Sequence, residues 1–97
     1  LIDHQQLTGE MQLAEQQLIE QLEFILQQRP DLVDKRLLLA RSLNADGQYS
    51  TAAREYKRTL RDAAQPGNAM LEEAAGFFDS VGLRWEAANA RQRMQPE

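Results

Sequence analysis

The chain contains no cysteine and only one histidine among its 97 residues. Without cysteine it can form neither a disulfide framework nor a thiolate metal site, and a single histidine leaves little of the usual zinc or acid–base chemistry. The lack of cysteine does not identify a compartment, because such a chain suits either redox environment. We therefore expect no disulfide and no metal site.

Long apolar runs are missing as well. No run approaches the roughly 20 residues that a membrane-spanning helix needs. Charged residues make up 27% of the chain and the mean hydropathy is −0.61, so we expect no membrane insertion. The 97 residues have room for one small domain but not for a large enzyme core. The net charge of the chain is −4.

The residues that are abundant favour helices throughout. Ala, Leu, Glu, Gln and Arg dominate, β-branched residues are sparse, and no stretch alternates apolar with polar side chains over the length of a strand. The sequence therefore predicts an all-α fold, with Asp31 as the N-cap of the second helix. The short connections predict antiparallel hairpins. The expected helices span residues 9–29, 31–44, 49–63, 68–81 and 83–94.

An internal repeat is visible in the small residues. Three glycines are each followed five residues later by an alanine: Gly9 by Ala14, Gly47 by Ala52, and Gly82 by Ala87. We expect each glycine to close one helix in a left-handed conformation, and each alanine to let two helices approach closely. Four further residues hold matching positions before the last two glycines: Ala40 and Ala75, and Leu43 and Phe78.

Residues 39–56, LARSLNADGQYSTAAREY, resemble the central pattern of the tetratricopeptide repeat, whose unit is a pair of antiparallel helices. The matching residues are Leu39, Ala40, Leu43, Gly47, Tyr49, Ala52 and Tyr56. Four residues depart from the pattern: Arg36, Thr59, Arg84 and Arg91. The resemblance implies a solenoid of about two and a half repeats, with a partial repeat over 1–30 that contains the remnant of a helix over 1–7, and full repeats over 31–66 and 67–97. An unrelated five-helix bundle is the alternative.

Catalytic chemistry has little support in the sequence. His4, the sole imidazole, has no serine or acidic partner at an interpretable spacing. Glu72 and Glu73 are adjacent, and neighbours on a helix point about 100° apart, so they cannot act as an acid–base pair. Asp31 and Asp34 are typical of helix starts, and there is no glycine-rich phosphate loop. We expect no catalytic residue and no cofactor.

A strip of cations on the third expected helix raises the question of nucleic acid. Its members are Arg54, Lys57, Arg58 and Arg61. The net charge is negative, and no aromatic residue is interleaved for base stacking. We therefore expect no nucleic-acid binding, and we expect the strip to face water or to pair with Glu55 and Asp62.

The resemblance implies a concave inner face, lined by the first helix of each repeat, that binds an extended peptide or a partner helix. The residues expected there are Asp34, Leu37, Arg41, Asn44, Ala69, Glu72, Gly76 and Asp79. Leu37 would offer an apolar contact and Arg41 a forked donor, unless both pack against the preceding helix. Leu37 and Glu72 occupy positions where the family's clamp for heat-shock chaperones needs polar or basic groups, so we do not expect that partner.

The expected function is that of a non-catalytic scaffold for protein–protein interaction. The chain begins at Leu1 rather than methionine and opens without signal-type features, so we expect a fragment of a longer protein. Its Gln-, Arg- and Ala-rich composition resembles that of proteobacterial helical-repeat proteins, which implies envelope assembly, polysaccharide export or secretion, in the cytoplasm or the periplasm. The alternatives are a structural spacer, a domain appended to a catalytic one, or a self-associating module.

Self-association is expected through the amino-terminal helix. Apolar residues surround much of its circumference: Leu13, Leu18, Ile19, Leu22 and Leu26. The outer helix of a solenoid needs a polar exposed face, and this one does not have it. We therefore expect either a homo-oligomer through this helix or a longer array.

Overall fold

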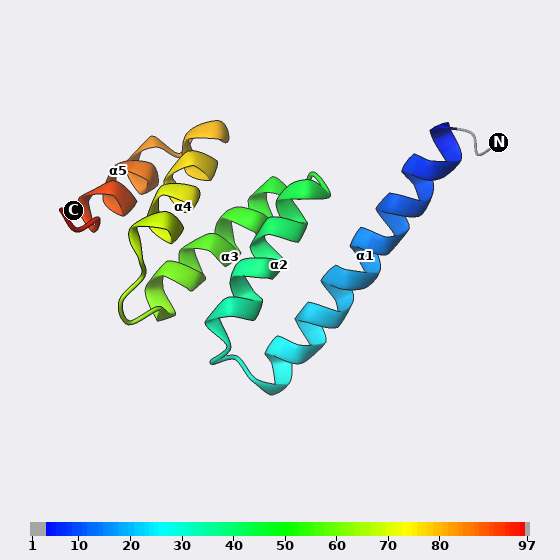
Figure 1. Ribbon diagram of the computed structural model, residues 1–97, viewed down its shortest axis with the longest axis horizontal. Coiled ribbons are helices and arrows are strands. Elements are labelled where there is room, and N and C mark those ends of the chain that lie inside the picture. Colours follow the sequence, from blue (N-terminus) through cyan, green and yellow to red (C-terminus); the bar gives the residue numbers. More distant parts are fainter. Residues whose placement is uncertain (1–3, 97) are drawn as a thin grey trace.

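The computed structural model describes the backbone of residues 4–96 and the side chains of residues 14–96. Within these limits the chain is all-helical, as the composition predicted (Figure 1). The five helices are α1 (His4–Gln28), α2 (Val33–Ala45), α3 (Tyr49–Asp62), α4 (Asn68–Ser80) and α5 (Arg84–Gln92). The ends of the last four lie within two residues of the expected ones.

The helices form antiparallel hairpins that follow one another along the longest axis of the molecule (Figure 1). The α2–α3 hairpin lies in the middle, with α1 on one side and the α4–α5 hairpin on the other. The molecule measures 51 × 30 × 24 Å. The two hairpins, residues 33–62 and 68–92, fall inside the ranges 31–66 and 67–97 expected for two repeats.

Glycine closes the first helix of each hairpin in the same way. Gly47 and Gly82 both have a φ of 82°, in the left-handed region that favours glycine. The residue after each glycine donates its N–H to a carbonyl of the preceding helix, that of Leu43 at 2.9 Å and that of Phe78 at 2.7 Å. These bonds satisfy carbonyl groups that the end of a helix would otherwise leave without partners.

The prediction for Gly9 was wrong. Gly9 lies inside α1 and closes no helix, and residues 4–7 belong to the same helix rather than to a remnant of another. Glycine inside a helix costs about 1 kcal/mol relative to alanine, which good helix formers on both sides can offset. Residues 1–3 and 97, and the side chains of His4 and Leu13, lie outside the part that the structure describes.

The start of α2 also differs from the prediction. Leu32, not Asp31, is the N-cap residue, and no side chain caps the helix. Asp31 instead accepts two hydrogen bonds from Arg29, at 3.0 and 2.9 Å. This bidentate contact lowers the pKa of the Asp31 carboxyl below its usual range, chiefly through the hydrogen bonds from Arg29. Because Arg29 binds the carboxylate of Asp31, this carboxylate does not cap the backbone N–H groups at the start of α2.

The core follows the small and large positions of the repeat. Leu43 and Phe78 are among the largest fully buried side chains. The alanines singled out in the two hairpins, Ala40, Ala52, Ala75 and Ala87, are all buried. An aromatic cluster joins the hairpins where Tyr56 of α3 stacks on Phe77 of α4, with ring centroids 4.6 Å apart. This packing supports the fold across the hairpin boundary.

Candidate binding surface

The residues expected on an inner face lie on α2 and α4, and most of them are exposed. Those exposed are Asp34, Arg41, Asn44, Ala69, Glu72, Gly76 and Asp79. Arg41 of α2 and Glu73 of α4 meet on this side of the molecule, so the two helices contribute to one surface. We call the exposed residues of α2 and α4 the α2–α4 face.

Leu37, which was also expected on this face, is buried instead, in agreement with the alternative that it packs against a neighbouring helix. It is 8% exposed and is part of the hydrophobic core, whereas its neighbour Leu38 is only partly buried. Residues 37–39 are three consecutive leucines, and each step along a helix turns by about 100°. An unbroken apolar run cannot reveal which of its members faces inward.

Arg41 is held in place by the second hairpin. Its Nε and Nη2 groups donate to the two carboxylate oxygens of Glu73, at 2.8 and 2.6 Å. The Tyr56 hydroxyl donates to the same carboxylate at 2.9 Å. The hydrogen bonds from Arg41 lower the pKa of Glu73, while burial and the contact with Glu73 raise the pKa of Tyr56 above its ordinary value. The side chain of Arg41 is still 51% exposed, so it remains accessible to a partner.

Glu72 and Asp79 are held by α5. Arg91 donates to Asp79 at 2.8 Å and to Glu72 at 3.4 Å. The hydrogen bond to Asp79 is the largest cause of the raised pKa of Arg91. Two carboxylates of α4 thus share one cation, and the α2–α4 face borders α5 through these ion pairs.

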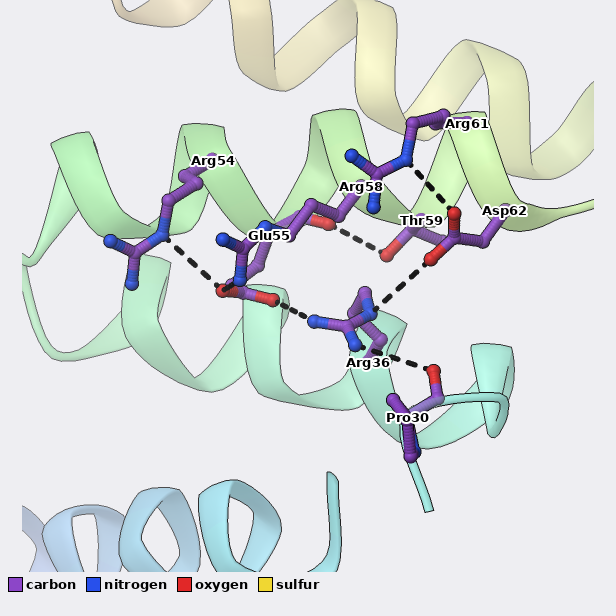
Figure 2. Close-up of polar contacts among 8 residues, drawn as sticks. All are labelled: Pro30, Arg36, Arg54, Glu55, Arg58, Thr59, Arg61 and Asp62. Atoms are coloured by element: carbon purple, nitrogen blue, oxygen red, sulfur yellow. Dashed lines mark hydrogen bonds and ion pairs between the residues drawn. The ribbon is translucent and has the colours of Figure 1, made fainter. Parts of the chain in front are cut away.

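The sequence did not predict the most deeply buried ion pair of the described residues, which lies inside the α2–α3 hairpin. Figure 2 shows Arg36 of α2 reaching toward Glu55 of α3, and the Nη1 group donates to Oε2 at 2.7 Å. Their side chains are only 10% and 4% exposed. Arg36 also donates from Nη2 to the Pro30 carbonyl at 3.3 Å. The one available signal was that Arg36 departs from the repeat pattern.

Further groups surround this buried pair (Figure 2). Arg54 and Arg58 approach the other oxygen of Glu55 at 3.5 and 3.4 Å. The hydroxyl of Thr59, a second departure from the repeat pattern, donates to the backbone carbonyl of Glu55 at 2.7 Å. The Nε of Arg36 is buried without a hydrogen bond and lies 4.0 Å from Asp62. The buried carboxylate is thus surrounded by three arginines, as a buried charge requires.

The cations of α3 are paired with carboxylates. Besides the contacts of Arg54 and Arg58 with Glu55, Arg61 lies 2.9 Å from Asp62. Lys57 pairs with Glu86 of α5 at 3.4 Å. Three of these pairs lie within α3 and one joins α3 to α5, so carboxylates offset the charge of the strip and lower its value as a binding surface for phosphates.

Two grooves on the molecule are lined by corresponding residues. The first, about 340 Å³, is lined by residues of α1, α2 and α3, among them Glu23, Leu26 and Gln27 of α1 and Leu43, Thr51, Arg54 and Arg58 of the hairpin. The second, about 290 Å³, has Phe78 of α4 in its lining together with Lys57, Leu60, Arg61, Glu86, Asn89 and Arg93. The second groove is lined at positions that follow those of α1 by 34 residues and those of the first hairpin by 35 residues, although most of the residue types differ. Both grooves are open to solvent.

A third and wider groove lies between the turns of the two hairpins. Its volume is about 660 Å³, and it is lined by Asn44, Tyr49, Ser50, Ala53, Ser80, Val81 and Leu83. Asn44, which belongs to the α2–α4 face, lies at its edge. The exposed ring of Tyr49 and the aliphatic Val81 and Leu83 give this groove an apolar character.

The described residues contain no cluster of metal-ligating side chains. No group of three or more His, Cys, Asp or Glu side chains within them could hold an ion. In the same part of the chain, no helix combines the length and the apolar character needed to cross a membrane. No protein-family model, no curated protein and no solved structure matches this chain.

Proposed function

We propose that this chain is a protein-binding module built from tetratricopeptide-like hairpins, with no catalysis of its own. It binds an extended peptide or a partner helix on the α2–α4 face. The proposed setting is a bacterial scaffold for envelope assembly, polysaccharide export or secretion, for which the composition is the only support. The alternative is a spacer that separates other domains.

The repetition of the hairpins carries the proposal. The turns share one glycine conformation, and most residues that line the two grooves hold positions 34 or 35 residues apart. Arg41 of α2 and Glu73 of α4 contact each other, so the first helix of each hairpin contributes to one surface. Stacked hairpins of this type present extended surfaces, which suit long and flexible partners.

The chemistry of the α2–α4 face supports a polar, directional partner. Arg41 uses one edge of its guanidinium for Glu73, and the outer Nη1 group remains for a carboxylate or a peptide carbonyl. Because Glu73 fixes the side chain, little conformational entropy is lost when a partner binds to it. Gly76 and Ala69 lie exposed on α4 and leave room for a backbone to approach.

Selection of peptides from a random displayed library against the wild-type chain tests this proposal. The selected peptides are then titrated against Arg41→Gln and against Arg84→Gln, a matched control at an exposed arginine of α5. We expect affinity to fall about tenfold for the first variant, since a hydrogen bond to a charged group contributes about 1.5–3 kcal/mol. The control should bind as the parent does.

Glutamine is preferred to glutamate at position 41, because a carboxylate there would face Glu73 and disturb the fold as well as the surface. Unchanged binding by Arg41→Gln, or equal losses in both variants, would contradict the use of the α2–α4 face. A library that gives no specific peptide would favour the spacer.

A further inference from the structure

One side of α1 has no counterpart to cover it. Ile19, Leu22 and Leu26 of α1 are buried, and α1 packs against α2. The residues 34 positions later are Ala53, Tyr56 and Leu60, which are buried in α3. α3 packs against α4, the first helix of the second hairpin, and α1 packs against α2, the first helix of the first hairpin. The contact of α1 with α2 therefore corresponds to the contact of α3 with α4.

α3 also has a second buried side, which packs against α2 in the hairpin; the corresponding side of α1 has no such partner among the described residues. Ala52, Glu55 and Thr59 are buried in the hairpin with α2, as the contact between Arg36 and Glu55 shows. The residues 34 positions earlier are Leu18, Gln21 and Ile25, of which Leu18 and Ile25 are half-buried and Gln21 is exposed. Among the described residues no helix covers this side of α1. We call Ala14, Leu18, Gln21 and Ile25 the α1 seam.

The amino-terminal part of α1 also extends beyond the rest of the molecule (Figure 1). The helix has 25 residues, whereas α2, which runs antiparallel beside it, has 13. The excess of 12 residues corresponds to about 18 Å of helix. A helical segment of this length is marginally stable in water unless something packs against it.

We propose that α1 pairs with the α1 of a second copy of this chain in an antiparallel helix pair along the α1 seam. The seam residues follow one another at spacings of four, three and four, and the sequence continues this rhythm back through Met11 to Leu7. This is the spacing of a two-helix seam. It is the same when read in either direction, which a twofold antiparallel pair requires.

The register of the pair follows from that symmetry. Position 14 of one copy lies opposite Leu18 of the other, position 11 opposite Gln21, and position 7 opposite Ile25, so that each pair of numbers adds up to 32. The extended part of each α1 then lies on the uncovered seam of the other copy. In this register the two α2–α5 regions lie toward opposite ends of the helix pair. The pairing spans about 27 Å of helix.

The side chains around the α1 seam suit a second copy. Phe24, 64% exposed, lies beside the seam and would lose much of its contact with water. Glu20 and Glu23 lie outside the seam. Glu15 would approach its own counterpart near the twofold axis, so we expect the dimer to become tighter as salt is added. One polar seam residue, Gln21, limits the affinity and fixes the register.

Sedimentation equilibrium of the whole chain over a range of concentrations tests the pairing. We expect a reversible monomer–dimer equilibrium. Gln21→Leu should tighten it by at least about tenfold, because it replaces the polar residue of the seam with an apolar one. Gln16→Leu adds the same apolar side chain on the opposite, exposed side of α1 and should leave the equilibrium unchanged. A monomer at all concentrations, or equal effects of both substitutions, would overturn the proposal.

Cross-linking tests the direction of the pair. The chain has no cysteine, so single cysteines can be introduced at exposed glutamines without competing thiols. Gln17→Cys lies near the twofold axis and should form a covalent dimer with a short bismaleimide. Gln28→Cys should not, because the antiparallel register places the two copies of residue 28 about 36 Å apart. Cross-linking of both variants would indicate a parallel pair, and cross-linking of neither would place the contact elsewhere; either result would refute the register.

Discussion

The α2–α3 and α4–α5 hairpins share a backbone plan but not a core. Residues 35 positions apart play the same parts in both: Gly47 and Gly82 in the turns, Ala52 and Ala87 at the close helix contact. At another pair of positions the first hairpin buries the ion pair of Arg36 and Glu55. The second hairpin has Leu71 and Ala90 there, both buried. The small residues and glycine turns thus tolerate either a charged or an apolar interior.

The two hairpins also differ at a second set of equivalent positions, again 35 residues apart. In the first, Leu37 and Tyr56 are buried, and Tyr56 contacts the second hairpin. Their equivalents in the second hairpin are Glu72 and Arg91, exposed and paired with each other. Exposed, paired charges of this kind are typical of a solvated helix surface. The two hairpins therefore differ in their buried polar residues and in one outer surface, whereas their glycine turns are the same.

The largest expected effect comes from breaking the ion pair that only the first hairpin has. Glu55→Ala leaves Arg36 buried without its partner, and we expect the free energy of unfolding to fall by about 3–5 kcal/mol. Urea denaturation followed by circular dichroism measures the loss. Arg54→Ala, which removes an exposed partner of the same carboxylate, is the control and should cost less than about 1 kcal/mol. Similar losses of stability in the two variants would contradict the prediction that the buried contact between Arg36 and Glu55 contributes more than the exposed one.

Overpacking at the close helix contacts should affect both hairpins alike. Ala52 and Ala87 are both fully buried, and replacing either with leucine should cost about 1–3 kcal/mol. Thermal melting of Ala52→Leu and Ala87→Leu compares the two positions. If either variant melts at the temperature of the parent, the equivalence of the two contacts is wrong.

Replacing a glycine of either turn with alanine should lower stability through backbone strain alone. A Cβ at Gly47 or Gly82 would meet nothing within 4 Å, so the left-handed φ is the only penalty, about 1–2 kcal/mol for alanine. Gly76, exposed inside α4 with equally open surroundings, is the matched contrast. Gly76→Ala should raise stability by about 0.5–1 kcal/mol. Chemical denaturation measures the free energy of unfolding of the alanine variants at Gly47, Gly82 and Gly76. A change of the same sign in all three would contradict this prediction.

The contact between the hairpins should give a small dependence on pH. Arg41 lowers the pKa of Glu73 in the folded state, so its contribution to stability is complete above the pKa of the unfolded chain, near 4.5. It is lost as the pH falls through the lower, folded value. Glu73→Gln should therefore flatten the acid side of the stability profile, by at most about 1 kcal/mol for a partly exposed pair. An unchanged acid limb would rule out this contribution.

Much of the backbone could be predicted from the sequence. Helical periodicity, glycines and prolines placed four of the helices within two residues, and the matched glycines Gly47 and Gly82 indicated the turns. Gly9 misled because a glycine inside a helix is tolerated when its neighbours favour helix. Local spacing therefore predicted the hairpins better than the start of α1.

The surface and the polar interior were harder to predict. Leu37 could not be told from Leu38 within a continuous run of leucines. Arg36 and Glu55 are 19 residues apart and on different helices, so no local spacing reveals that they meet. The same holds for Arg41 and Glu73, whose contact depends on how one hairpin packs on the next.

Exchanging the interior of one hairpin for that of the other tests whether the two are copies of one unit. The double variant Arg36→Leu, Glu55→Ala gives the first hairpin the residues of the second. We expect its free energy of unfolding to lie within about 1 kcal/mol of the parent, although each single substitution costs about 3–5 kcal/mol, because an apolar pair can replace a buried ion pair. A double variant that loses as much as the two single losses added together would contradict the equivalence of the hairpins.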